Sequence, residues 1–259
     1  MKHEISYSII NLDKPAGMTC REIDELVKNK FGCKKTGHTG TLDFNATGVL
    51  IVCCDETLKA MPLLIGMNKE YEGSIYLHKD VPLKLIRKTI KDKFTGIIIQ
   101  IPPVKSRVAR KSRKRNIYSF KILKKKQKNL YFRAKVESGT YIRKLASDLG
   151  KELGTGAHLK TLIRTRVGPF LLKDSVKINK INKIIPIEKA LKYSKKVYVK
   201  KASLEKIRHG APINQKEISR KSKTKPDEKV AIFYKNKLIA IGIAKNKSLR
   251  IDRVLKVRE

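Results

Sequence analysis

A run of six apolar residues, Val49 to Cys54, constrains the fold more than any other feature of the chain. So many consecutive apolar side chains are typical of a buried strand. The segment Gly37-His-Thr-Gly-Thr-Leu-Asp43 stands just before it and carries a single carboxylate. We therefore predict a glycine-rich loop that leads into a buried strand and presents Asp43 to a ligand. By spacing alone, an aspartate that hydrogen-bonds its own backbone in a turn is the more common alternative.

The charge balance predicts a polyanionic partner. The chain has 61 lysines and arginines against 23 aspartates and glutamates, a formal net charge of +38 over 259 residues. Seven of the eleven residues from Lys105 to Arg115 are basic, and residues 121–128 add five lysines beside strand-like apolar segments. We expect a folded surface that binds nucleic acid, with a solvated face as the general alternative. The named candidates are Lys105, Arg110, Lys111 and Arg113.

Several other classes are disfavoured. A hydrophobic content of 41% over this length allows one or two domains with a sizeable core. Residues 1–6 lack the apolar run of a signal peptide, and no segment approaches a membrane span. We therefore expect a cytoplasmic protein, nucleolar if the source is eukaryotic, with no membrane partner. The cysteines have no metal-ligand spacing, and no dinucleotide-type loop is present, so we expect no metal and no cofactor. They are Cys20, Cys33, Cys53 and Cys54.

Helix and strand patterns alternate along the first two thirds of the chain. Thr19 and Glu22 form a capping box that begins a helix, and Gly32 is placed to end it. Strands with one buried face and helices in this order predict an α+β domain over residues 1–194, with a mixed, largely antiparallel sheet. The other predicted elements are strands at Ile9–Leu12, Tyr71–Leu77, Ile117–Leu123 and Leu130–Val136, the last two joined by a lysine-rich loop, and helices at Lys84–Lys93 and Tyr141–Leu153.

The composition changes near residue 195. From there to residue 259 the chain holds short β-rich runs separated by polar and basic segments. We predict a small β-barrel that is marginal alone and stable when docked on a larger domain. Its charge makes RNA binding the expected role, with a purely structural role as the alternative.

Five motifs occur in an order and spacing that resemble the TruB-type pseudouridine synthases. They are Lys14-Pro-Ala-Gly17, Gly37-His-Thr-Gly-Thr-Leu-Asp43, Lys69-Glu-Tyr71, Gly139-Thr-Tyr-Ile-Arg-Lys-Leu145 and Gly154-Thr-Gly-Ala-His158. The resemblance runs from about Ile9 to Phe170. The segment Ser203–Gly210 opens a tail that resembles the PUA domain, an RNA-binding barrel. The resemblance implies isomerisation of uridine to pseudouridine in RNA, a reaction that needs no cofactor.

Two branches of this family compete. One acts alone on the T-loop of tRNA, at uridine 55, and the other is the dyskerin-like catalytic subunit of H/ACA guide-RNA particles. The segments Gln100–Tyr118, Glu137–Leu145 and Gly156–Phe170 resemble the dyskerin-like branch. A guide RNA, an rRNA or tRNA substrate and accessory proteins are then the expected partners. Phe44 departs from the family, in which proline follows the catalytic aspartate.

The resemblance assigns roles to individual residues. Asp43 corresponds to the catalytic carboxylate, and Arg143 to the arginine that pairs with it. Tyr71 corresponds to the residue that stacks on uracil, while Tyr141 and Leu162 would line the pocket. Without the resemblance, tyrosines and leucines such as Tyr71, Tyr141 and Leu162 are more often core residues. The corresponding alternative for Arg143 is a solvated arginine on a helix.

Other residues are expected to contact RNA. His38 would contact the flipped nucleotide or its phosphates, with a hydrogen-bonded loop histidine as the alternative. The remaining RNA-binding candidates are Arg164, Arg208 and Gly210. A function of another class, a non-catalytic RNA-binding scaffold in ribosome assembly, would not need Asp43, Tyr71 and Arg143 together.

Overall fold

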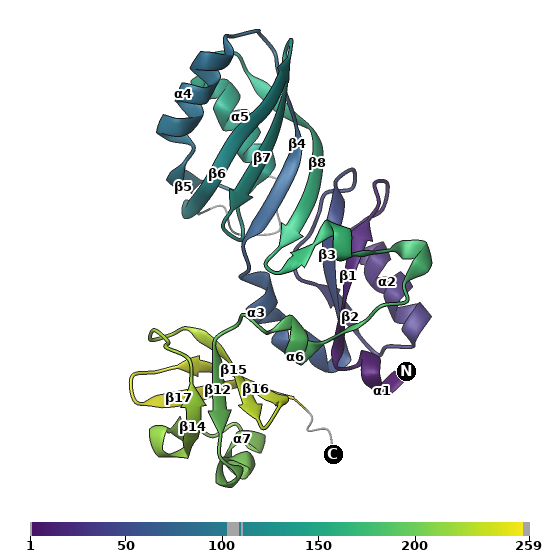
Figure 1. Ribbon diagram of the computed structural model, residues 1–259, viewed down its shortest axis with the longest axis vertical. Helices are drawn as coiled ribbons and strands as arrows, with labels where there is room; N and C mark the ends of the chain where they lie inside the picture. Colours follow the sequence, from purple (N-terminus) through teal and green to yellow (C-terminus); the bar gives the residue numbers. More distant parts are fainter. Residues whose placement is uncertain (1, 103–108, 110, 256–259) are drawn as a thin grey trace.

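The computed structural model describes residues 2–102, 109 and 111–255, which form two sheets with helices around them (Figure 1). Apart from the parallel pairs β1–β10 and β3–β8, the pairs recorded in the larger sheet are antiparallel. Its main path is β10 (Val176–Lys177), β1 (Ser8–Lys14), β3 (Thr47–Cys54), β8 (Ala157–Val167), β4 (Lys69–Leu77), β7 (Asn129–Val136), β6 (Arg113–Lys126) and β5 (Gly96–Gln100). The short strands β2 (Thr36–His38), β9 (Phe170–Leu171) and β11 (Ile185–Pro186) pair with β3, β8 and β1.

The larger sheet narrows between β3 and β8. These strands pair only at Thr47–Ile163 and Gly48–Arg164, whereas β8 pairs with β4 along most of its length. Figure 1 shows β1 and β3 diverging from β4 and β8 beyond this point. Gly48 has φ +105, and a Cβ there would lie 2.3 Å from the carbonyl oxygen of Arg164. Only glycine allows so close an approach, so the junction of the two halves depends on it.

Helices cover one face of each half. The helix α2 (Cys20–Phe31) begins with the predicted capping box and ends at Gly32 in the left-handed conformation. The helices α4 (Leu83–Lys93) and α5 (Ile142–Glu152) lie against the other half (Figure 1). Their buried side chains join those of α2 in one continuous core. The remaining helical turns are α1 (Lys2–Ile5), η1 (Asp55–Ala60), α3 (Met61–Ile65), η2 (Leu172–Asp174), η3 (Ile178–Lys180) and α6 (Ile187–Ala190).

The second sheet is six-stranded and barrel-like, and it contains only residues after Lys195. Its order is β13 (Ile213–Asn214), β17 (Ser248–Val254), β16 (Lys237–Ala244), β15 (Lys229–Tyr234), β12 (Lys196–Val199) and β14 (Ile218–Lys221). The helical segments η4 (Lys201–Ser203), α7 (Leu204–Arg208) and η5 (Gln215–Glu217) connect them. The α+β class, the largely antiparallel sheet and the small barrel are therefore confirmed.

The barrel is docked on the larger domain through apolar side chains. Phe233 and Leu238 of the barrel belong to the same buried cluster as Val49 and Ile51 of β3. The contacts join α3 with β15, α6 with β16 and η1 with β17. The apolar run that dominates the sequence therefore supports the barrel with one face, while its other face packs under α2.

Two parts of the predicted secondary structure were wrong. The lysine-rich segment is not a loop, because β6 continues to Lys126 and the chain turns at Gln127, which has φ +48. Strand β8 was missed, since only part of its length is buried and its charged side chains hide the alternation. Its pairing with β4 nevertheless forms the middle of the sheet.

Substitution of Gly48 tests the narrow junction. Gly48→Ala should lower the free energy of unfolding by more than about 2 kcal/mol, because backbone strain and a clash with Arg164 act together. Gly66→Ala is the matched control: Gly66 has helical backbone angles, and a Cβ there meets no atom within 4 Å. It should change stability by less than about 0.5 kcal/mol in urea unfolding. Equal stability of the two variants would contradict the close approach at Gly48.

Candidate active site

The side chains of Asp43 and Arg143 meet where the two halves of the sheet join. Arg143 Nη2 donates to Asp43 Oδ1 at 2.9 Å, and Arg143 Nε lies 2.8 Å from Asp43 Oδ2. Both side chains are about half exposed, at 47% and 48%. Two parallel bonds from one guanidinium fix the carboxylate in direction as well as position. Asp43 therefore binds Arg143 through its side chain, while only its carbonyl oxygen accepts a turn hydrogen bond, from Ala46 N.

The loop that carries Asp43 is held from one side by Lys14. The Lys14 side chain is fully buried, and its Nζ donates to the carbonyl oxygens of Phe44 at 3.1 Å and Ala46 at 2.9 Å. A third bond goes to Pro15 O at 2.8 Å. Burial lowers the pKa of Lys14. A fully satisfied ammonium inside the protein thus fixes the backbone on the carboxyl side of Asp43.

Arg164 holds the same loop from the other side. Its guanidinium donates to Val49 O at 2.7 Å and to Gly40 O at 2.9 Å, and the residue is 2% exposed. We expected Arg164 to contact RNA, and that prediction was wrong, because β8 places its side chain under the loop. It connects the carbonyl groups before and after Asp43 instead. The sequence gives no sign of this, since arginine is seldom buried.

Tyr71 and Leu162 lie on the adjacent strands β4 and β8 near this junction. Tyr71 is buried and pairs in register with Arg164 on one side and Ala134 on the other. Leu162 is partly buried, opposite Gly73. Both residues therefore lie on strands at the junction where Asp43 and Arg143 pair. Their pocket roles stay a prediction.

Lys69, next to Tyr71 in its motif, connects three segments around the junction. Its Nζ donates to Met67 O at 2.7 Å, to Ile65 O at 3.1 Å and to Ser138 Oγ at 3.1 Å. Burial, with a smaller contribution from nearby Arg164, lowers its pKa to about 8. Lys69 thus ties the end of α3 to the loop that leads into α5.

Gln100 fixes the start of α5 and was missed by sequence reasoning. Its side-chain Oε1 accepts from Tyr141 N at 3.0 Å, and its Nε2 donates to Tyr141 O at 3.2 Å. Gln100 is buried at the end of β5, and Tyr141 is the N-cap of α5, two residues before Arg143. The buried amide of Gln100 binds both backbone groups of Tyr141 and so fixes the position of the first turn of α5, which carries Arg143. The only available signal was a glutamine that follows three isoleucines.

His38 has partners for both ring nitrogens. Nδ1 lies 2.7 Å from Asp24 Oδ2 on α2, and Nε2 lies 3.1 Å from Thr41 Oγ1. The geometry agrees with the alternative of a hydrogen-bonded loop histidine rather than with a residue free to bind a nucleotide. His38 therefore anchors the Asp43 loop to α2.

The other RNA-binding candidates are scattered. Lys105 and Arg110 lie outside the described residues. Lys111 is exposed, and Arg113 is half-buried at the start of β6. Arg208 is exposed, pairs with Glu205 at the end of α7, and precedes Gly210, which has φ +71. The structure does not join these positions into one site, and their role stays a prediction.

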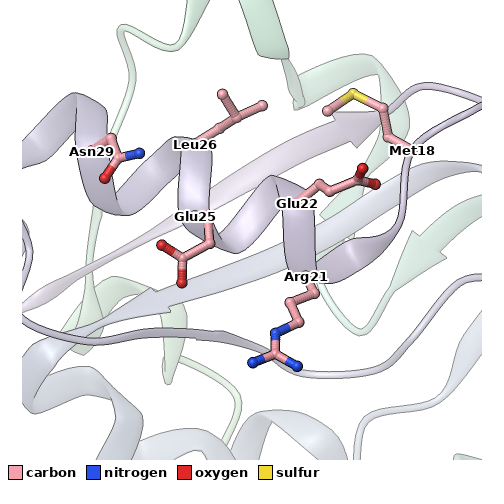
Figure 2. A pocket seen from close by; sticks show the side chains of 6 residues that line it. All are labelled: Met18, Arg21, Glu22, Glu25, Leu26 and Asn29. Carbon is pink, nitrogen blue, oxygen red and sulfur yellow. The ribbon is translucent and has the colours of Figure 1, made fainter.

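Other parts of the described structure carry fewer groups that could bind or act on a ligand. An open pocket of about 530 Å³ lies along α2, where Glu22 serves the helix cap and Glu25 faces Lys28 at 3.5 Å (Figure 2). It contains none of the predicted site residues. Within the described residues there is no group of three potential metal ligands, and the four cysteines are buried thiols. No described helix has the length and apolar character of a membrane span.

Two family models and several curated relatives match this chain. Residues 28–88 match the TruB family pseudouridylate synthase (N terminal domain), and residues 143–200 match the tRNA pseudouridylate synthase B C-terminal domain. The chain is 38% identical to the probable tRNA pseudouridine synthase B of Nanoarchaeum equitans, over 93% of this chain and 74% of that protein. The counterpart from Korarchaeum cryptofilum is 39% identical, over 93% and 80%.

Two solved structures are similar over nearly the whole chain. One is described as a Cbf5-Nop10-Gar1 complex, with a TM-score of 0.87, 32% identity and coverage of 97% of this chain and 85% of the other. The second is an H/ACA RNP bound to a substrate RNA containing 2′-deoxyuridine, with a TM-score of 0.86, 31% identity and coverage of 100% and 88%. Sequence and fold thus agree over both domains. The chain belongs to the TruB family of pseudouridine synthases, isomerases that act on RNA.

Proposed function

We propose that this pseudouridine synthase uses Asp43 as its catalytic carboxylate and works under the direction of a guide RNA. The observation that carries the catalytic part is the Asp43–Arg143 pair at the junction of the two half-sheets. The guide-directed part is supported by likeness to two solved structures, one of a Cbf5-Nop10-Gar1 complex and one of an H/ACA RNP bound to a substrate RNA. An H/ACA guide, an rRNA or tRNA substrate and accessory proteins are the proposed partners.

The isomerisation of uridine requires one oriented carboxylate from the protein and little else. The C1′–N1 bond of uridine breaks, the uracil turns, C5 bonds to C1′ and releases its proton, and N1 takes up a proton, so the reaction adds no net atom or electron. The Asp43 carboxylate serves by attack at C1′, by attack on the uracil or by removal of the 2′ proton, and the two bonds from Arg143 fix its direction. The buried bonds from Lys14 and Arg164 hold the loop rigid before the substrate arrives.

The target uridine must leave its stack to reach Asp43. The carboxylate is half exposed and Tyr71 on β4 is buried, so a base that contacts both must leave its stack. Tyr71 supplies the aromatic face, and Leu162 with Tyr141 completes the walls. The barrel is proposed to act as a PUA domain that grips RNA, with Arg208 and Gly210 at its surface.

Stand-alone modification of tRNA is the second candidate. It is favoured by the archaeal relatives, which are described as probable tRNA pseudouridine synthases B. Both candidates use the same Asp43 chemistry and differ in how RNA is presented.

Two substitutions test the catalytic pair. Asp43→Asn should abolish tritium release from RNA labelled at uridine C5. Arg143→Lys should lower kcat at least tenfold with RNA affinity almost unchanged, because lysine keeps the charge and loses the two parallel bonds. Arg133→Lys is the matched control, since Arg133 pairs with Glu72 on the solvent face of β7. A defect of Arg143→Lys confined to RNA affinity would contradict the pairing.

Guide dependence is tested with one enzyme preparation and two substrates. We expect slow modification by the protein alone and faster modification when an H/ACA guide RNA, its matched target and the accessory proteins are added. The reason is that a guide positions the flipped uridine over Asp43. Rapid modification of a bare tRNA T-loop, unimproved by any guide, would favour the stand-alone candidate and leave the catalytic assignment intact.

The basic edge near β6 has its own test. If Lys111 and Arg113 contact phosphates, Lys111→Ala/Arg113→Ala should flatten the plot of log affinity against log salt by roughly 1.4, at about 0.7 per contact for single strands. Turnover at saturating RNA should hold near the wild-type value, because these side chains do not touch uracil. An unaltered slope would indicate a solvated face.

A further inference from the structure

An open cleft of about 760 Å³ separates the barrel from the larger domain. Its apolar lining includes Leu63 and Met67 from the α3 region, Pro169 just before β9 and Leu171 within β9. The opposite side is formed by residues 193–195, which lead into β12 of the barrel, and by residues 228–229, where β15 begins. The volume is in the range of pockets that hold small ligands.

The cleft lies apart from the proposed active site. It includes Glu70, which stands next to Tyr71 on β4, and Lys135, next to Val136 on β7. Because successive side chains of a strand point to opposite faces, Glu70 and Lys135 face away from the core that holds Tyr71 and Val136. A ligand in the cleft therefore leaves the approach to Asp43 open.

The cleft carries a surplus of positive charge. Its lining has four cations, Lys135, Arg166, Lys195 and Lys229, against two carboxylates, Glu70 and Glu228. Glu70 already faces Arg166 at 3.5 Å and Lys135 at 3.8 Å, and Glu228 accepts from the backbone of Lys225 at 3.0 Å.

Two of these cations remain available to a ligand. In the part of the chain that the structure describes, Lys195 and Lys229 have no recorded acidic partner, and both are exposed. They lie at the same end of the parallel pair β12–β15, where Lys195 O accepts from Ala231 N. Two ammonium groups at one edge suit the phosphates of a nucleic-acid strand.

An exposed aromatic ring stands beside these cations. Tyr193, in the connection between α6 and β12, is 73% exposed. Lys192 Nζ lies 5.6 Å from the centre of its ring. Most of the ring is therefore open to water, with the Lys192 ammonium over part of it. Aromatic faces beside basic side chains are the usual platform for unpaired bases.

We infer that this cleft binds one unstacked nucleotide of the RNA, with its base on Tyr193 above the apolar lining and its phosphates at Lys195 and Lys229. The inference rests on RNA as the ligand of this family and applies whether a guide or a tRNA is bound. Such a contact would connect the barrel to the larger domain through the RNA itself.

The test uses the full-length chain and fluorescein-labelled pentaadenylate, which contains no uridine and so cannot be turned over at Asp43. Fluorescence anisotropy at fixed salt gives its affinity. Tyr193→Ala should weaken binding about tenfold or more through loss of stacking, and Tyr193→Phe should restore it to within about twofold. Lys195→Ala/Lys229→Ala should reduce the salt slope by roughly 1.4.

Two controls separate the cleft from general charge effects. Lys88→Ala/Lys91→Ala removes two exposed charges from α4 and should leave the affinity within about twofold of wild type. Tyr131→Ala removes another exposed tyrosine, on β7, and should do the same. Wild-type affinity in Tyr193→Ala, or equal losses in Tyr193→Ala and Tyr193→Phe, would overturn the inference.

Two further measurements identify the cause of any change. Displacement of the pentamer by AMP at concentrations near the Kd of the pentamer would assign the cleft to a free nucleotide and overturn the RNA inference. Pseudouridine formation is measured separately in the same variants. An inactive enzyme with intact Tyr193-dependent binding would contradict the proposed function alone, and an active enzyme without such binding would contradict this inference alone.

Discussion

The buried guanidinium of Arg164 is the interaction on which the rest of the structure depends. Arg164 sits on β8 where that strand meets β3, and it binds the carbonyl oxygens of Gly40 and Val49. One residue thus joins the two half-sheets and holds the loop between them. Gly48 makes the contact possible, because any side chain there would collide with the backbone of Arg164. An unpaired buried guanidinium would be costly, so the loop and the strand must be positioned together.

This constraint explains how a half-exposed carboxylate is held firmly. Lys14 satisfies the carbonyl groups after Asp43, and Arg164 satisfies those around it, so the loop has little freedom. The partner Arg143 comes from the other half of the sheet, at the first turn of a helix whose N-cap is fixed by Gln100. Each half therefore brings one charge to the junction. The Asp43 carboxylate is half exposed, while the side chains that support its loop are inside the protein.

The apolar strand β3 has a second consequence. One of its faces is covered by α2 and the other by the barrel, through Phe233 and Leu238. The barrel is thus placed by the same strand that follows the Asp43 loop. A cleft with surplus positive charge is left at the margin of this docking surface. RNA held by the barrel and RNA at Asp43 would therefore contact one connected framework.

Local patterns in the sequence determined the elements that need only near neighbours. The capping box at Thr19, the left-handed Gly32 and the buried run of β3 were predicted because caps and periodicity act over a few residues. The motif order also indicated Asp43 and Arg143. Tertiary structure decided what lies far apart in the chain: the strand β8, the burial of Arg164, the partners of His38 and the three bonds of Lys69. The physical reason is that a charged side chain is identical in sequence whether it faces water or a ring of carbonyl groups. Only the pairing of distant strands determines which of these surrounds it.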